Sequence, residues 1–215
     1  MTEQLQEWRK DFGNEYTQRN LLTTEEVENT YLLSYGITRS SMNKLFLDFL
    51  DRDMRILEVG TNVGLQLNLL SKLGFKNLYG IEINPSAIEI SQQINKSLPV
   101  YIIKASAFDI PFKDNWFDLV FTSGVLIHIH PNDISSATKE IYRCTNNYIW
   151  GFEYFTSEGY KEIIYRGKSN LLWKTDFKKV FFNNFSDLTL MKEQLFPYKN
   201  EPDLIDQMFL LEKNK

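Results

Sequence analysis

The sequence has little cysteine and lacks a long apolar run. Its single cysteine, Cys144, cannot form a disulfide within the chain. No apolar stretch reaches the roughly 18–20 residues that a bilayer-spanning helix needs, so we expect no membrane partner. The first residues are polar and mixed in charge, unlike a signal peptide. These absences predict a cytoplasmic protein.

A strong basic charge is also missing. The formal net charge is −4 and the isoelectric point is about 5.3. Proteins that hold nucleic acid backbones usually carry a basic stripe, so we expect no nucleic acid partner. The oligomeric state does not follow from the sequence.

Short apolar runs alternate with helical patterns along the chain. This alternation predicts a Rossmann-like α/β fold, with a seven-stranded mostly parallel sheet, helices on both faces and an antiparallel C-terminal strand. The expected strands are 55–59, 77–82, 99–104, 116–122, 148–154, 187–195 and 207–212, and the expected intervening helices are 64–73, 85–95 and 132–143.

The domain organisation is expected to be simple. Residues 1–37 are predicted to form an N-terminal helical cap, with Trp8, Phe12 and Tyr16 at helical spacing on one packed face. Residues 38–215 are predicted to form the main domain. Within it, the aromatic and basic segment 156–185 is interpreted as a lid or insertion.

A strand that runs into a glycine-containing turn and then a helix indicates a ligand site at the first turn of the sheet. Here the turn contains Gly60, Asn62 and Gly64, and Glu58 precedes it. A dinucleotide site needs a third glycine, which the turn lacks. A carboxylate beside a pyrophosphate is also unfavourable, whereas Glu58 suits a cationic ligand such as S-adenosylmethionine.

Two further segments support a nucleoside site. Glu82 ends the second expected strand, where a carboxylate accepts hydrogen bonds from ribose hydroxyls. This feature fits either cofactor, and its structural alternative is a solvated strand end. Ser106 and Ala107 leave the third strand, where an adenine ring would lie.

The motifs EVGTNVG, GIEIN, SAFDIPF and FDLVFTSGVLIHI together resemble the motif series of class I S-adenosylmethionine-dependent methyltransferases. This resemblance implies S-adenosylmethionine as cofactor and no metal. Two residues depart from the family pattern: Asn62 replaces the middle glycine, and Ser106 replaces an aspartate. Asn tolerates positive φ, so the turn is expected to survive. The implied cofactor-binding residues are Glu58, Gly60, Asn62, Gly64, Glu82, Ser106, Ala107 and Ser123.

Further segments resemble a narrower group. FGNEYTQRN, VLIHIHP, FEYF, YRG and WKTDF are similar to segments of methyltransferases associated with pseudaminic acid biosynthesis. This resemblance implies a sugar-derived acceptor from a pseudaminic acid or nucleotide-sugar pathway.

His128 is the candidate catalytic residue. It follows the fourth expected strand, where it would act as a base or orient the acceptor. A hydrogen-bonded structural histidine is the competing interpretation. A metal site built from His128, His130 and Asp133 is a third interpretation, although it offers few ligands.

The candidate acceptor-binding residues lie in the segments that resemble the narrower group. Arginine and lysine suit a carboxylate or phosphate, and tyrosines stack on a sugar or base. Ordinary ion pairs and packed tyrosines are the alternatives. The residues are Tyr16, Arg19, Tyr154, Tyr165, Arg166 and Lys174.

The leading hypothesis is therefore methyl transfer to a small, anionic, sugar-derived acceptor. A non-catalytic protein that keeps the fold to bind S-adenosylmethionine or a partner is the second hypothesis, because Asn62 and Ser106 depart from the family pattern. A nicotinamide-dependent oxidoreductase is the third, and the missing glycine disfavours it.

Overall fold

The computed structural model describes residues 3–214 of the chain. They divide into two compact units, which meet in the sequence between Ser106 and Ala107. Within the described residues, no helix is both long enough and apolar enough to cross a bilayer.

The N-terminal unit begins with helices, as expected for its first residues. Thr23 caps the third helix through a reciprocal capping box with Glu26, and Gly36 ends that helix with φ 79°. Such caps satisfy backbone groups that the helix ends leave unpaired. The helices are α1 (Glu3–Arg9), α2 (Asp11–Arg19), α3 (Thr24–Tyr35) and α4 (Arg39–Leu47).

The expected aromatic group near the N-terminus forms across a break between two helices. Trp8 lies on α1, whereas Phe12 and Tyr16 lie on α2. The Trp8 ring contacts both, with centroid distances of 5.1 Å to Phe12 and 5.2 Å to Tyr16. These edge-on contacts hold α1 against α2.

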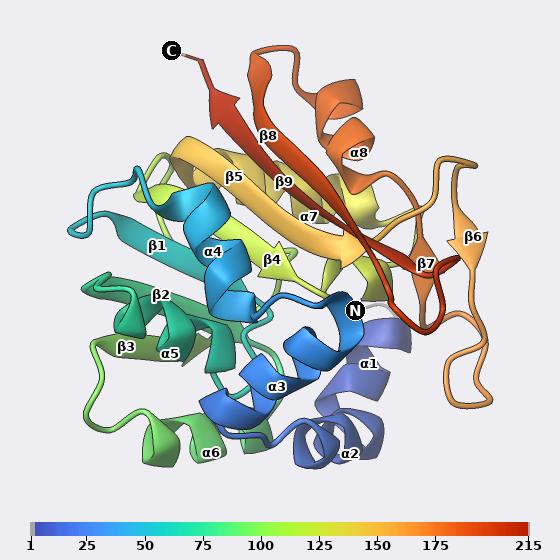
Figure 1. Cartoon of the computed structure of the whole chain (residues 1–215), viewed down its shortest axis with the longest axis horizontal. Helices are drawn as coiled ribbons and strands as arrows, with labels where there is room; N and C mark the ends of the chain where they lie inside the picture. Colours follow the sequence, from blue (N-terminus) through green and yellow to red (C-terminus); the bar gives the residue numbers. More distant parts are fainter. Residues whose placement is uncertain (1–2, 215) are drawn as a thin grey trace. The chain divides into compact units, whose positions relative to one another are not determined.

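Three parallel strands follow in the N-terminal unit, in the order β3-β2-β1. A helix connects each strand to the next, because parallel strands need a long crossover connection. In Figure 1, α5 lies in front of β2 and β3. The elements are β1 (Arg55–Val59), α5 (Leu65–Lys72), β2 (Asn77–Glu82), α6 (Pro85–Ile94) and β3 (Val100–Lys104).

The C-terminal unit contains four sheet strands in the order β4-β5-β9-β8. β4 and β5 are parallel, whereas β9 is antiparallel to both β5 and β8. The short link between β8 and β9 explains that antiparallel pair. The strands are β4 (Phe117–Ser123), β5 (Thr145–Tyr154), β8 (Leu188–Pro197) and β9 (Ile205–Lys213).

The core of the C-terminal unit forms between these strands and two helices, α7 (Ile134–Cys144) and α8 (Phe177–Asn184). Figure 1 shows α7 behind β4 and β5. Gly151 of β5 lets the Phe209 ring of β9 pack directly against the backbone, because a Cβ at residue 151 would lie 2.3 Å from that ring. A side chain at that position would clash with the core.

The segment predicted as a lid or insertion is partly packed. It contains a small hairpin of β6 (Lys161–Glu162) and β7 (Trp173–Lys174), followed by α8. Trp173 and Phe177 are buried, whereas Ile164 at the other end of the hairpin is 64% exposed.

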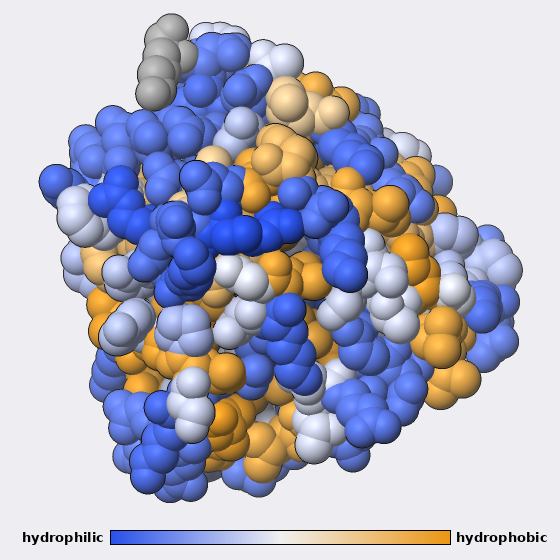
Figure 2. All heavy atoms as spheres, turned by 60° about the vertical axis from the view of Figure 1, so that its left-hand side comes forward, coloured by the Kyte–Doolittle hydropathy of each residue, from blue (hydrophilic) through white to orange (hydrophobic). Residues whose placement is uncertain are grey.

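The fold class predicted from the sequence is confirmed. The series β3-β2-β1 and β4-β5-β9-β8 supply the strands of a Rossmann-like α/β fold. Figure 2 shows apolar and hydrophilic side chains interleaved on one face of the molecule. Scattered exposed apolar groups of this kind are usual on protein surfaces.

Candidate active site

The turn between β1 and α5 has a backbone that few residue types adopt. Gly60, Asn62 and Gly64 have φ values of 72°, 50° and 84°. Alternating positive φ values explain why two positions are glycine and one is asparagine. The turn therefore forms with Asn62 in place of the middle glycine, as expected.

Hydrogen bonds to main-chain and side-chain groups fix the backbone of the turn. The N–H groups of Gly60 and Thr61 both donate to the Ile81 carbonyl, at 2.9 and 3.0 Å. Asn95, at the end of α6, donates from Nδ2 to the Val63 carbonyl at 2.9 Å. Buried polar groups paired in this way hold a loop rigidly.

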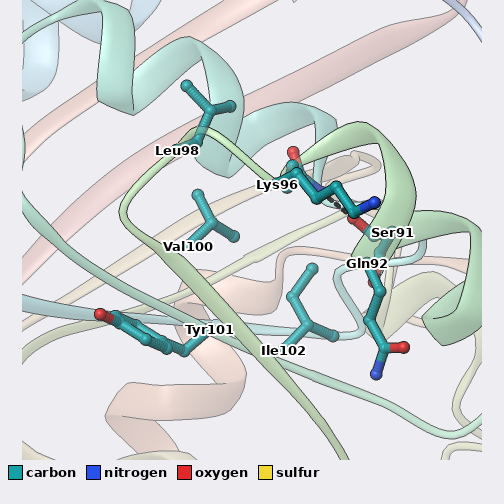
Figure 3. Close-up of a pocket in the computed structure, with 8 residues that line it drawn as sticks. Ser91, Gln92, Lys96, Leu98, Val100, Tyr101 and Ile102 are labelled. Carbon is teal, nitrogen blue, oxygen red and sulfur yellow. Dashed lines mark hydrogen bonds between the residues drawn. The ribbon is translucent and has the colours of Figure 1, made fainter.

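A pocket of about 330 Å³ lies between α6 and β3, and Asn95 is among the residues that line it (Figure 3). Gln92 and Lys96 reach it from the helical side, and Val100 and Ile102 reach it from β3. The pocket contains none of the residues predicted to bind cofactor or acceptor.

Glu82 is buried at the end of β2, with 9% of its surface exposed. Its Oε2 accepts the Asn62 N–H at 2.8 Å. Its Oε1 accepts the N–H groups of Ile83 at 2.7 Å and Asn84 at 2.8 Å. Burial raises the pKa of Glu82, and these hydrogen bonds oppose that rise. The alternative of a solvated strand end is therefore wrong.

Glu58 lies under the turn and is 3% exposed. Its carboxylate accepts the Thr61 hydroxyl at 2.5 Å. Burial raises the pKa of Glu58 to about 8, although the nearby positive charge of Arg39 opposes this rise. The structure thus shows Glu58 bonded within the turn itself, rather than open to solvent.

The residues after β3 begin beside Glu82. The Ala105 N–H donates to the Glu82 carbonyl at 3.0 Å, so Ser106 follows close to the end of β2. Ser106 and Ala107 are both partly exposed. Ser123, the remaining predicted cofactor residue, ends β4 in the C-terminal unit and pairs with Phe152 of β5.

Helix α2 carries the two predicted acceptor residues of the N-terminal unit. Tyr16 is partly exposed and packs on Trp8. Arg19 forms an ion pair with Glu15, at 3.6 Å between Nη1 and Oε2. The same helix contributes Thr17, whose hydroxyl donates to Asn62 Oδ1 at 2.9 Å. The sequence analysis did not single out Thr17.

The loop after β4 carries the predicted catalytic residue of the C-terminal unit. It begins at Gly124, with φ 67°, and continues into the short 3₁₀ helix η1 (Leu126–His128). Glu153 of β5 lies beneath it and is 1% exposed. Its carboxylate accepts the N–H groups of Val125 at 3.2 Å and Ile127 at 3.4 Å.

Glu153 was missed as a functional residue in the sequence analysis. It also accepts hydrogen bonds from the Leu126 N–H and the Thr122 side chain, while burial raises its pKa to about 7. The available signal was a single acidic residue within the otherwise uncharged strand β5. A buried charge of this kind is retained where it is well hydrogen-bonded.

His128 ends η1 and is fixed by a distant backbone group. Its Nδ1 lies 2.8 Å from the Leu171 carbonyl. A carbonyl accepts hydrogen bonds and does not donate them, so Nδ1 carries the proton and Nε2 carries the lone pair. Burial lowers the pKa of His128 to about 4. The imidazole is therefore neutral at neutral pH.

Tyr165 approaches His128, with 5.5 Å between their ring centroids. His130 instead packs against Trp173 at 5.1 Å, and its Nδ1 accepts the Asn132 N–H at 3.1 Å. Among the described residues, no group of three His, Cys, Asp or Glu side chains is placed to hold a metal ion.

The remaining predicted acceptor residues occupy strand ends and a turn. Tyr154 ends β5 and pairs with Asp206 of β9. Arg166 is exposed and has φ 52° in the turn of the β6–β7 hairpin. Lys174 lies directly opposite Lys161 on the paired strands.

Comparison with known proteins identifies the central segment. Residues 57–147 match the model of the methyltransferase domain family. Over this segment the chain is similar to the methyltransferase domain family. The matched segment includes Glu58, the Gly60–Gly64 turn, Glu82 and His128.

Two curated relatives share part of this domain. A cycloartenol-C-24-methyltransferase of Oryza sativa subsp. japonica is 30% identical over 94 residues, which is 42% of this chain and 27% of the relative. A human EEF1A lysine methyltransferase is 36% identical over 81 residues, 36% of this chain and 34% of the relative. The matches thus span about a third or less of the relatives' lengths.

The similarity in fold extends over more of the chain. A 1,6-didemethyltoxoflavin-N1-methyltransferase of Burkholderia thailandensis, solved with S-adenosylhomocysteine bound, has a TM-score of 0.62 and is 14% identical. The match covers 82% of this chain and 76% of that one. The chain therefore shares the fold of this structure.

Proposed function

We propose that the chain is an S-adenosylmethionine-dependent methyltransferase that acts on a small, anionic, sugar-derived acceptor. The observation that carries the proposal is the hydrogen bond between the Asn62 N–H and the buried Glu82 carboxylate. It joins the positive-φ turn to a carboxylate at the neighbouring strand end. Ligands of open α/β sheets bind at such carboxyl ends of strands.

The chemistry of these residues fits the cofactor. A carboxylate has about four acceptor positions, and three backbone N–H groups bond to Glu82. About one acceptor position therefore remains for a ribose hydroxyl. Glu58 contributes by holding the turn in shape, since its carboxylate is bonded to Thr61. When bound, S-adenosylmethionine supplies a methyl group that is already activated by a sulfonium.

His128 is proposed to hold the acceptor. Because Nδ1 donates to Leu171, Nε2 presents a lone pair that accepts a hydrogen bond from an acceptor hydroxyl or amine. With a pKa of about 4, the imidazole is a weak base. Its main contribution is therefore orientation, which alone supplies about 7–11 kcal/mol in well-aligned displacements.

The β6–β7 hairpin supports an anionic acceptor. Lys161 and Lys174 are directly paired across the two strands, and Arg166 occupies the intervening turn. Like charges directly opposite each other destabilise a strand pair. A bound carboxylate or phosphate relieves that repulsion. The curated relatives are named for a sterol and a protein acceptor, so the acceptor class depends on the residues of this chain.

The proposal is tested in two steps. Calorimetric titration with S-adenosylhomocysteine measures cofactor binding. Transfer of a labelled methyl group from S-adenosylmethionine is then assayed with anionic acceptors, namely acidic sugars and nucleotide-activated sugars, and with matched neutral free sugars. We expect transfer to the anionic set. Binding without transfer to any acceptor would support a non-catalytic binding protein, and transfer restricted to neutral sugars would contradict the anionic class.

A further inference from the structure

Helix α2 contacts the cofactor turn through one side-chain hydrogen bond. The Thr17 hydroxyl donates to Asn62 Oδ1 at 2.9 Å, across 45 residues of sequence. Thr17 is 2% exposed, so water does not compete freely for this bond. A hydrogen bond shielded from water contributes more to local order than an exposed one.

A second contact joins helix α1 to the residues that follow β2. Asn84 Nδ2 donates to the Trp8 carbonyl at 3.3 Å. Gly13 of α2 permits this approach, because a Cβ there would lie 1.9 Å from the Trp8 oxygen and 2.7 Å from Asn84 Nδ2. Helices α1 and α2 therefore rest on both segments that surround Glu82.

Asn62 is the residue that links these parts. Its N–H bonds to the Glu82 carboxylate, its backbone has φ 50°, and its side chain bonds to Thr17. A glycine would keep the first two properties and lose the third. The side chain of Asn62 thus has a use that the turn geometry alone does not require.

We propose that Asn62 and Thr17 form a latch that couples cofactor binding at Glu82 to the position of helix α2. The inference rests on the proposed function, because it takes the ligand of Glu82 to be S-adenosylmethionine. Helix α2 also carries the predicted acceptor residues Tyr16 and Arg19. The latch therefore makes acceptor binding follow cofactor binding, so that the acceptor site is completed on the loaded protein.

Thermodynamic reciprocity sets the size of the effect. If the bound cofactor stabilises α2, then an ordered α2 strengthens cofactor binding by the same factor. A hydrogen bond of this type is worth about 1 kcal/mol, which corresponds to a change of about fivefold in affinity. Removing either partner should therefore weaken cofactor binding by about fivefold. Removing both partners should weaken cofactor binding no more than removing one of them.

The test measures amide hydrogen exchange in residues 11–19 with and without S-adenosylhomocysteine. We expect the ligand to slow exchange there in the natural chain. Asn62→Gly and Thr17→Val should abolish this slowing, whereas Thr17→Ser keeps the hydroxyl and should retain it. Thr30→Val is the matched control, because the Thr30 hydroxyl bonds to the Glu26 carbonyl within α3. Circular dichroism checks that each variant is folded.

The outcomes separate the latch from the proposed function. Ligand-dependent slowing that disappears in both Asn62→Gly and Thr17→Val supports the latch. If the natural chain binds S-adenosylhomocysteine without slowing exchange in α2, or if the two variants retain the slowing, the latch is wrong and the proposed function stands. If the natural chain does not bind the ligand, the proposed function fails and the latch fails with it.

Discussion

The turn after β1 and the loop after β4 are both held by a buried carboxylate, but they differ in how their shape is specified. The turn after β1 needs positive φ at Gly60, Asn62 and Gly64. The loop after β4 is instead fixed by Glu153, which lies 28 residues from Val125, and by the Leu171 carbonyl, which lies 43 residues from His128.

This difference explains why one loop has a local sequence signature and the other does not. Positive φ restricts the residue types at particular positions, so the turn is visible in a short motif. Hydrogen bonds from distant residues place no such restriction on the loop itself. A cofactor turn is thus easier to identify from sequence than the loop that carries His128.

Replacement of His128 should have the largest effect on turnover, and it should show that the two loops have different roles. His128→Ala removes the group proposed to orient the acceptor, so we expect turnover to fall by about 100-fold or more. Binding of S-adenosylhomocysteine, measured by calorimetry, should remain. His130→Ala is the control, since His130 packs on Trp173. Unchanged turnover in His128→Ala would remove this residue from the mechanism.

Replacement of Glu82 should weaken cofactor binding, which the replacement of His128 should leave intact. Glu82→Gln removes a charged acceptor near the ribose, and hydrogen bonds to charged groups are worth about 1.5–3 kcal/mol. We expect affinity for S-adenosylhomocysteine to fall by about 10- to 100-fold in the calorimeter. Glu89→Gln makes the same change on the exposed side of α6 and should leave affinity unaltered. Equal affinities for the two variants would show that Glu82 does not contact the cofactor.

Buried carboxyl groups should make the free energy of unfolding fall with increasing pH, and the raised pKa of Glu82 acts in the same direction as those of Glu58 and Glu153. Burial raises the pKa of Glu58 to about 8 and that of Glu153 to about 7. From about pH 4.5, the ordinary pKa of a glutamate, the folded chain then binds more protons than the unfolded chain, so these groups lower the free energy of unfolding as the pH rises to about 8. Between about pH 4 and 6.5 the lowered pKa of His128 acts in the opposite direction.

Urea unfolding at a series of pH values measures this dependence. Each carboxyl group contributes a slope of at most about 1.4 kcal/mol per pH unit. Glu153→Gln should reduce the slope below about pH 7, whereas Glu58→Gln should reduce it up to about pH 8. Stability that stays constant or rises from pH 6.5 to 8 in the natural chain would contradict the assigned burial of these charges.

The smallest expected effect concerns the β6–β7 hairpin. Arg166→Ala should raise KM for an acidic acceptor by about five- to tenfold, because an exposed charge contact is worth about 1 kcal/mol. The effect should shrink in high salt, and kcat should change little. Lys139→Ala on α7 serves as the surface-charge control. If Arg166→Ala leaves KM unchanged, the hairpin does not bind the anion.

Local patterns predicted much of the fold. The bounds of β1 and β2 agree with the expected ranges, because each is a short apolar run that ends at a turn or a polar residue. The break between α1 and α2 at Lys10 was missed, since Trp8, Phe12 and Tyr16 keep helical spacing across it. Periodicity records which side chains share a face and does not record a break in the backbone.

The candidate site was predicted unevenly for the same physical reason. The turn residues and Glu82 lie in motifs whose spacing follows from local geometry. The burial of Glu82 and the roles of Thr17 and Glu153 depend on partners far away in the sequence. Such long-range pairs leave no local pattern, so they become visible only in the folded chain.

A thermal-unfolding comparison of two ligands tests the central claim most directly. A ligand that binds the folded chain raises its melting temperature by mass action. The account predicts that S-adenosylhomocysteine raises the melting temperature in a saturable way and that NAD does not. A rise with NAD and none with S-adenosylhomocysteine would contradict the assignment of the Gly60–Gly64 turn and Glu82 to a methyl-donor site.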